Sequence, residues 1–170
     1  MIPTLHSVRL TLRPQTMADF PDFAAFMASP RAQFMGGPKE RSQAWGWLAP
    51  DQAQGSLLGW GGLSVTETAG ARLVGQGNMT RPPAFPETEI GWTACEEGQG
   101  FLTEAVRAVI GWAFGPRGLT MLVMYANRTD VRAIRMAERL GAVLDAGAVT
   151  PSGIDYPDYH FTNRGQHVSH

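Results

Sequence analysis

Hydrophobic and polar residues recur along the chain with two different periods, one typical of strands and one of helices. Residues 8–12 alternate as Val-Arg-Leu-Thr-Leu, which predicts a half-buried strand. Thr16 and Asp19 then form a capping box at the start of a helix. That helix buries four apolar residues at helical spacing: Phe20, Phe23, Ala24 and Met27. The pair Ser29-Pro30 ends it.

The middle of the chain changes from helical to strand patterning. Residues 40–48 predict a short helix whose buried positions are Ala44, Trp45 and Leu48. Residues 57–66 and 72–79 predict an antiparallel hairpin with its turn near residues 68–70. The prolines of residues 81–86 predict a loop, and residues 87–94 predict a further strand.

The last third alternates helices and strands. A helix is expected over residues 101–114, and the apolar run 121–126 is typical of a strand covered on both faces. A second helix over residues 130–140 ends at Gly141, and residues 156–162 form a last strand. The helix over 130–140 is expected to bury Val131, Ile134, Ala137 and Leu140. The order predicts a single α/β (α+β) domain over residues 1–170, with one mixed, mostly antiparallel sheet flanked by about four helices.

Composition narrows the classes of partner and compartment. Lys and Arg number 14 against 15 Asp and Glu, so the net charge of −1 argues against nucleic-acid or anionic-membrane binding. Cys95 is the one cysteine, which excludes an internal disulfide and fits a reducing, cytoplasmic setting. The four histidines show no ligand spacing, so no metal is expected. No apolar run approaches the roughly 18 residues of a membrane span, and the start has no signal-peptide pattern.

The segment that carries candidate chemistry is the turn at residues 96–100, between a strand and a helix. Gly98 and Gly100 allow the backbone to approach a ligand closely, and the first turn of the helix offers unpaired N–H groups. The turn lacks the Lys and Ser/Thr of a P-loop and the third glycine of a dinucleotide-binding loop. On local features, a purely structural turn and an anion site are both open.

Four passages, in this order, resemble the GNAT N-acetyltransferase superfamily, and most closely its RimJ/RimL-type branch. They are R-L-T-L-R-P at residues 9–14, E-I-G-W at 89–92, G-Q-G-F-L-T-E-A at 98–105, and the helix with its following glycine at 130–141. The resemblance spans residues 8–164, nearly the whole chain, and leaves a short C-terminal tail at 165–170.

The resemblance implies an acetyl-CoA-dependent N-acetyltransferase without a metal, acting as a monomer or homodimer. The acetyl group would pass directly, through a tetrahedral intermediate, to the primary amine of a protein N-terminus or a small molecule. The fourth and fifth strands would splay apart and hold the pantetheine arm. The implied cofactor-binding residues are Trp92, Thr93, Ala94, Gly98, Gln99, Gly100, Phe101, Leu102, Thr103, Asn127 and Asp130.

Several positions depart from the family pattern. The turn after Gly91 is about two residues shorter, and Leu102 replaces a small residue. Asp130 and Ala133 stand where relatives carry Asn and Ser, although Asn127 can supply an amide and Asp130 suits a helix cap. A thiol leaves adequately as the thiolate near neutral pH, and a water or one of three tyrosines could otherwise supply a proton: Tyr125, Tyr156 or Tyr159. These departures also favour an alternative, a non-catalytic acyl-CoA-binding sensor or interaction protein.

A general base is needed because a primary amine is mostly protonated at neutral pH. Glu89 is the candidate, with Glu87 on the same strand face as a second possibility and an ion-paired or exposed Glu89 as the structural alternative. A backbone N–H of Trp92 or Thr93 would meet the oxyanion. An acetyl-Cys95 intermediate is disfavoured because no histidine partner is in view. Three tryptophans and one loop could line an acceptor pocket or belong to the core: Trp45, Trp47, Trp60 and residues 82–86.

Overall fold

The strands form one sheet in which β5 and β6 are parallel neighbours and every other neighbouring pair is antiparallel. The computed structural model describes residues 1–95, 97–151 and 156–163. The spatial order in the described part is β1-β2-β3-β4-β5-β6-β8-β7. The strands are β1 (Leu5–His6), β2 (Leu10–Pro14), β3 (Gly62–Glu67), β4 (Leu73–Thr80), β5 (Glu89–Ala94), β6 (Met121–Tyr125), β7 (Val143–Asp145) and β8 (Asp158–Thr162).

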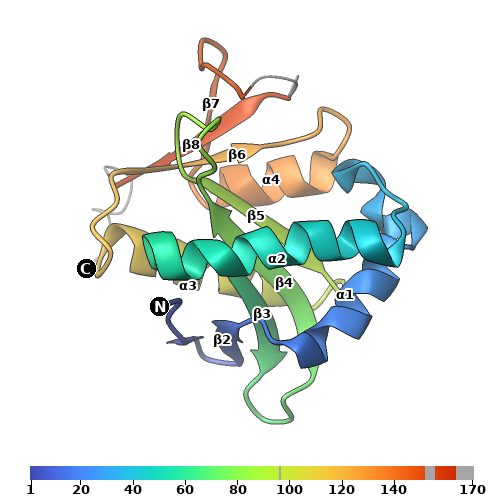
Figure 1. Ribbon diagram of the computed structural model, residues 1–170. Helices are drawn as coiled ribbons and strands as arrows, with labels where there is room; N and C mark the ends of the chain where they lie inside the picture. The colour runs from blue at the N-terminus through green and yellow to red at the C-terminus, as the bar shows by residue number, and fades with distance from the viewer. Residues whose placement is uncertain (96, 152–155, 164–170) are drawn as a thin grey trace.

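Helices cover both faces of this sheet. They are the 3-10 helices η1 (Met17–Asp19) and η2 (Pro30–Met35), and the α-helices α1 (Phe20–Met27), α2 (Arg41–Leu58), α3 (Phe101–Phe114) and α4 (Val131–Arg139). In Figure 1, α2 crosses in front of the central strands and α3 lies behind them. The larger core joins the sheet to α3 and α4, and a smaller one joins α1, η2 and α2. The predicted α/β class with its mixed, mostly antiparallel sheet is confirmed.

The parallel pair β5 and β6 separates almost as soon as it begins. The two strands share one register pair, Glu89 with Val123, and the N–H of Val123 donates to the carbonyl of Thr88 at 2.9 Å. The other edge of β5 is paired with β4 along its whole length, from Thr80–Glu89 to Gly75–Ala94. The predicted splay between these two strands is therefore confirmed, and it leaves one edge of β5 open beyond Glu89.

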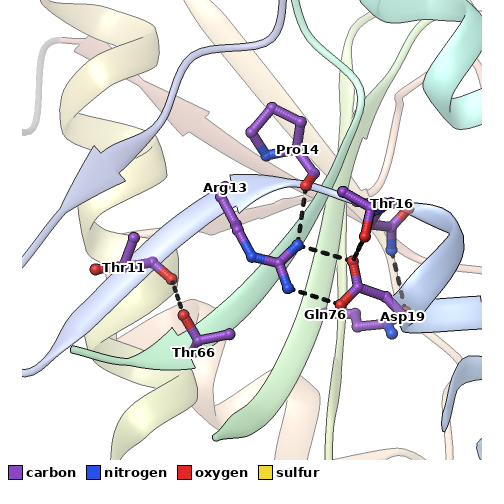
Figure 2. A network of polar contacts seen from close by, with 8 residues as sticks. Thr11, Arg13, Pro14, Thr16, Asp19, Thr66 and Gln76 are labelled. Carbon is purple, nitrogen blue, oxygen red and sulfur yellow. Dashed lines mark hydrogen bonds and ion pairs between the residues drawn. The ribbon is translucent and has the colours of Figure 1, made fainter. Parts of the chain in front are cut away.

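A partly buried ion pair fixes the start of α1 against β2. The guanidinium of Arg13 donates to both carboxylate oxygens of Asp19, at 2.7 and 2.8 Å, as Figure 2 shows. The N–H of Thr16 also donates to Asp19 at 2.7 Å, so the predicted capping box is confirmed. Burial would raise the pKa of Asp19, but these donors and Ser64 outweigh it and lower the pKa to about 2.

The largest departure from the sequence prediction is the length of α2. The helix predicted over residues 40–48 runs on to Leu58 through Pro50, and the strand predicted from residue 57 begins at Gly62. Pro50 removes one backbone donor, the partner of the Gly46 carbonyl. Packing compensates, because Ala44, Leu48 and Gly55 are all buried along one face.

Smaller corrections concern the ends of the chain and exposed positions. The strands β1 and β7 were not predicted, and the first predicted strand starts at Leu10 because Val8 is exposed. Trp45 and Val131, predicted to be buried, are 43% and 49% exposed. By contrast, α3 has the predicted bounds, and Gly141 follows α4 with a φ of +95°. The predicted tail 165–170 and Glu96 of the predicted turn lie outside the described residues.

Candidate functional site

A cavity of about 510 Å³ lies where β5 and β6 separate. Its lining comes from α2, β4, β5, the end of β6 and the start of α4. The wall is largely apolar, and its large side chains are Phe23, Phe34, Met35, Trp47, Phe85 and Met124. Three carboxylates line this space: Asp51 on α2, Glu89 on β5 and Asp130 at the start of α4. A cavity of this kind suits a small organic group with one charged end.

Glu89 stands at the last paired position of β5 and β6, where the open edge begins. Burial, followed by the nearby charges of Asp51 and Asp158, raises its pKa to about 7. An ion pair with arginine would have lowered the pKa instead. Glu87, the second candidate from the sequence, does not line the cavity in the described structure. A carboxyl group with a pKa near 7 can exchange protons at neutral pH.

Asp51 reaches the same cavity from α2. Its Oδ2 accepts a hydrogen bond from Nδ2 of Asn78 on β4 at 2.7 Å. Burial raises the pKa of Asp51 to about 6, although the hydrogen bond from Asn78 opposes the shift. Sequence reasoning missed Asp51 because it ended the helix before Pro50. Continued helical spacing from Ala44 and Leu48 would have put Asp51 close to the buried stripe.

The open edge of β5 presents backbone groups in alternation. The N–H of Cys95 donates to the carbonyl of Val74 on β4 at 3.0 Å, so Thr93 also directs its backbone toward β4. Trp92 and Ala94 therefore direct theirs toward the open edge. Among the three predicted pantetheine contacts, two thus lie at this edge through their backbone, while Thr93 lines the cavity. The side chain of Trp92 packs against the larger core, as predicted.

The turn before α3 has the left-handed backbone that only glycine adopts easily. Gly98 has a φ of +82°, and Gly100, the residue that caps α3, has a φ of +72°. The first α3 backbone bond runs from the N–H of Glu104 to the carbonyl of Gly100 at 3.1 Å. The N–H groups of Phe101, Leu102 and Thr103 therefore precede the helical ladder and suit an anion. Gln99 is exposed beside them.

The side chain of Leu102 points into the protein rather than toward the turn. It packs against the larger core, and a Cβ added at Gly75 on β4 would meet its Cδ1 at 3.5 Å. The large residue at this position thus adds core and leaves the turn open.

Arg9 ties the turn to β2, a relationship the sequence analysis did not foresee. Its Nε donates to Oε2 of Glu104 at 2.7 Å, and its Nη1 donates to the carbonyl of Gln99 at 3.2 Å. Its guanidinium also lies 4.6 Å from the ring centre of Phe101. Burial would raise the pKa of Glu104, but the hydrogen bonds from Ser7 and Arg9 and the charge of Arg9 outweigh it. The pKa of Glu104 is therefore lowered, and its carboxylate stays ionised.

Two further arginines gather at the same turn. Arg132 of α4 pairs with Glu97 at 2.6 Å, and Arg31 of η2 lies 3.6 Å from the other oxygen of Glu97. Arg31 also donates to the carbonyls of Ala94 and Cys95. Arg132 thus lies beside the turn. The local charge suits an anionic ligand.

The start of α4 closes the cavity. Asp130 caps the helix by accepting the N–H of Ala133 at 3.1 Å, as its position indicates. Nδ2 of Asn127 donates to the hydroxyl of Tyr156 at 3.4 Å, and its Oδ1 accepts from Thr129. Asn127, Asp130 and Ala133 all line the cavity.

The three tyrosines considered as proton donors occupy different places. Tyr125 and Tyr156 line the cavity, whereas Tyr159 is buried in the larger core. The hydroxyl of Tyr125 is buried without a partner among the described residues, and its ring packs on Phe85 at 5.7 Å. Burial, Asp158 and Glu89 raise the pKa of Tyr125 to about 12, so it stays protonated.

The residues proposed for an acceptor pocket also divide between the cavity lining and packed positions elsewhere. Trp47, Pro82 and Phe85 line the cavity. Trp45 packs edge-on against Phe20, and Trp60 is buried in the larger core. No group of three or more His, Cys, Asp or Glu in the described part of the chain could hold a metal ion. No described helix is both long and apolar enough to cross a membrane.

The family model described as "Acetyltransferase (GNAT) domain" matches residues 9–143. An acetyltransferase structure from Agrobacterium tumefaciens shares 38% sequence identity with the chain, covers 95% of each chain and has a TM-score of 0.89. No curated protein sequence matches.

Two more distant structures share the fold. RimL, a ribosomal L7/L12 α-N-protein acetyltransferase in complex with coenzyme A, is 15% identical, covers 94% of this chain and 98% of its own, and has a TM-score of 0.73. MccE, the microcin C7 self-immunity acetyltransferase in complex with acetyl-CoA and AMP, is 15% identical, covers 92% and 93%, and has a TM-score of 0.69.

Proposed function

The chain belongs to the GNAT acetyltransferase family, and we propose that it transfers the acetyl group of acetyl-CoA directly to a primary amine. The observation that carries this proposal is the place of Glu89. This buried carboxyl, with a pKa near 7, lines the cavity at the vertex where β5 and β6 separate. A base is needed there because an amine attacks only after losing its proton.

The residues at the open edge and the turn fit acetyl-CoA. The backbone of Trp92 and Ala94 would hold the pantetheine arm, and the N–H groups of residues 98–103 would hold the pyrophosphate. Positive φ at Gly98 and Gly100 and the nearby arginines support this assignment. Asn127 and Asp130 line the far side of the same cavity. The bound cosubstrate supplies an acetyl group activated as a thioester.

Three groups of the chain would then act on the reacting atoms. The carboxylate of Glu89 takes a proton from the ammonium of the acceptor, and the free amine nitrogen bonds to the acetyl carbon to give a tetrahedral intermediate. The nitrogen then loses its surplus proton to solvent as the carbon–sulfur bond breaks, which leaves the neutral amide. The N–H of Trp92, directed to the open edge, meets the negative oxygen. The hydroxyl of Tyr125 gives its proton to the departing sulfur and regains one from solvent or Glu89.

Two proteins with this fold differ in what they are described as serving. RimL is a ribosomal L7/L12 α-N-protein acetyltransferase, and MccE is a microcin C7 self-immunity acetyltransferase. We assign the chain to the RimJ/RimL-like group on its four sequence passages and keep both a protein N-terminus and a small amine as acceptors. Cys95 as the one cysteine fits a reducing compartment, so we place the protein in the cytoplasm.

Calorimetry with acetyl-CoA, followed by a thiol-release assay over a panel of amines, tests the proposal. We expect the protein to bind acetyl-CoA and to turn over at least one amine. This turnover should be lost in Glu89→Gln and kept in Glu87→Gln. Binding without turnover on any amine would favour the non-catalytic acyl-CoA-binding alternative. Absence of acetyl-CoA binding would refute both.

A further inference from the structure

The helix α2 presents a row of residues to the cavity that the acetyl-transfer chemistry does not use. Gly46, Trp47, Pro50, Asp51 and Gln54 all line it, and they recur once per helical turn on one face of α2. Pro50 has no N–H, so the carbonyl of Gly46 lacks its partner one turn later. This face therefore combines an apolar surface, a carboxylate and a backbone acceptor.

The carboxylate of Asp51 is held in place across three elements. Asn78 on β4 donates to it at 2.7 Å. The opposite end of the Asn78 amide lies over β5, because a Cβ added at Gly91 would meet Oδ1 of Asn78 at 2.7 Å. On the other side, a Cβ at Gly61 would collide with the backbone carbonyl of Asp51. The absence of side chains at Gly61 and Gly91 thus lets α2 and Asn78 approach closely.

Asp51 and Glu89 leave a negative charge in an apolar space. Within the described residues, no lysine or arginine forms an ion pair with either carboxylate. A buried charge without a counter-ion is costly, so a cationic ligand gains from pairing with it. The two carboxylates line the same cavity from different elements, α2 and β5, so an ammonium group bound there would be attracted by both.

The rest of the lining determines which kind of acceptor body can accompany the ammonium group. Trp47, Phe34, Phe85 and Tyr125 contribute aromatic surface. The third carboxylate of the lining, Asp130, already accepts the N–H of Ala133 as the cap of α4, so the further charges of a polycation would lie mainly against aromatic surface. A flat or branched apolar body would instead bury its surface there.

Resting on the proposed function, we propose that Asp51 anchors the ammonium group of the acceptor, and that the acceptor is a compact monoamine on an aromatic or branched apolar body. Asp51 holds the ammonium, and Glu89 removes its proton. Asp51, on α2, thus sets the acceptor specificity, while Glu89, on β5, acts as the base.

The test compares four amines on the full chain: 2-phenylethylamine, spermidine, kanamycin and a tetrapeptide with a free N-terminus. We expect 2-phenylethylamine to have the highest kcat/KM. Asp51→Asn should raise its KM at least about tenfold, the effect of a lost charge-assisted hydrogen bond, with little change in kcat or in the KM for acetyl-CoA. Asp51→Glu should restore part of the affinity, and Asp22→Asn on the exposed face of α1 serves as the control.

Calorimetric titration of 2-phenylethylamine into CoA-saturated protein gives a second readout that needs no turnover. Binding to the wild type and its loss in Asp51→Asn would support the inference. Preference for spermidine, kanamycin or the peptide, or an unchanged KM in Asp51→Asn, would overturn it while leaving the acetyltransferase proposal intact. Absence of thiol release with every amine would instead refute the proposed function, and the inference with it.

Discussion

The carboxylate of Glu104 in the first turn of α3 accepts both the backbone N–H of Arg9, at 2.8 Å, and its guanidinium Nε, at 2.7 Å. Ser7 donates to the same carboxylate at 2.7 Å. Residues separated by 95 positions thus lock the start of α3 to the first strands. Because Nη1 of Arg9 also donates to the carbonyl of Gln99, between Gly98 and Gly100, this contact helps to set the position of the candidate phosphate site.

Neutralising Glu104 should therefore loosen the fold and the turn together. We expect Glu104→Gln to lower the free energy of unfolding by about 1–3 kcal/mol, because three donors lose a charged acceptor. Acetyl-CoA affinity should fall as well. Glu67→Gln, which breaks the exposed hairpin pair with Arg72, is the control and should cost within about 0.5 kcal/mol. Urea unfolding and calorimetry measure both effects, and equal losses in the two variants would contradict the assignment.

Replacing the candidate base should abolish one feature of the pH profile. With a pKa of about 7 for Glu89, the wild-type kcat/KM should rise through neutral pH as the carboxyl ionises. Glu89→Gln should lower kcat by about 100-fold or more and remove that rise. Glu87→Gln should keep both. An unchanged profile in Glu89→Gln would exclude this residue as the base.

The same substitution should stabilise the protein at high pH. The folded pKa of Glu89 is about 7 against an ordinary 4.5, so the folded state binds more protons than the unfolded state between these values and loses stability as pH rises. Glu89→Gln removes this loss, which amounts to at most about 3 kcal/mol above pH 7. Thermal unfolding at pH 5 and pH 8 measures the difference. A variant no more stable than the wild type at pH 8 would contradict the buried ionisation.

Replacing either of two glycines, one before α3 and one within it, by alanine should change the free energy of unfolding in opposite directions. Gly100 has a φ of +72°, so Gly100→Ala should cost about 1–2 kcal/mol of unfolding free energy and weaken acetyl-CoA binding. Gly111 lies inside α3, exposed, with no atom within 4 Å of an added Cβ. Gly111→Ala should stabilise the helix by about 0.5–1 kcal/mol and leave binding unchanged. Undiminished affinity in Gly100→Ala would show that the turn does not hold the phosphates.

Tyr125 can be tested without disturbing the packing. Its hydroxyl is buried without a partner in the described structure, so Tyr125→Phe should keep or raise the free energy of unfolding. If this hydroxyl protonates the departing sulfur, kcat should fall by about tenfold or more, while Tyr156→Phe keeps more activity. The opposite ranking of the two variants in a thiol-release assay would assign the proton to Tyr156.

Local patterns predicted those parts of the molecule that local contacts determine. The helix α3 has the predicted bounds because its apolar period is regular and glycines stand at both ends. The hairpin of β3 and β4 followed from two apolar runs around a short turn. In contrast, α2 was cut short because Pro50 disfavours a helix locally, whereas the buried stripe of Ala44, Leu48 and Gly55 holds it together.

The candidate site depended on contacts that no local pattern contains. Glu89 and the turn were found through motifs within one segment of the chain. Asp51 lies 38 positions before Glu89 and meets it across the cavity only because α2 continues past Pro50. Burial raises the pKa of both carboxyls, and for Glu89 the charges of Asp51 and Asp158 add to it, so neither shift could be predicted from residue types alone.

The single register pair between β5 and β6 divides the sheet into two groups of strands. Strands β1 to β5 form one group, and β6, β8 and β7 form the other. Backbone hydrogen bonds couple the strands within each group, whereas among the described residues the two groups share only the pairing at Glu89 and Val123. A ligand bound between β5 and β6 as an extra strand would couple the two groups through its own hydrogen bonds. Substrate binding would then rigidify the molecule far from the reacting atoms.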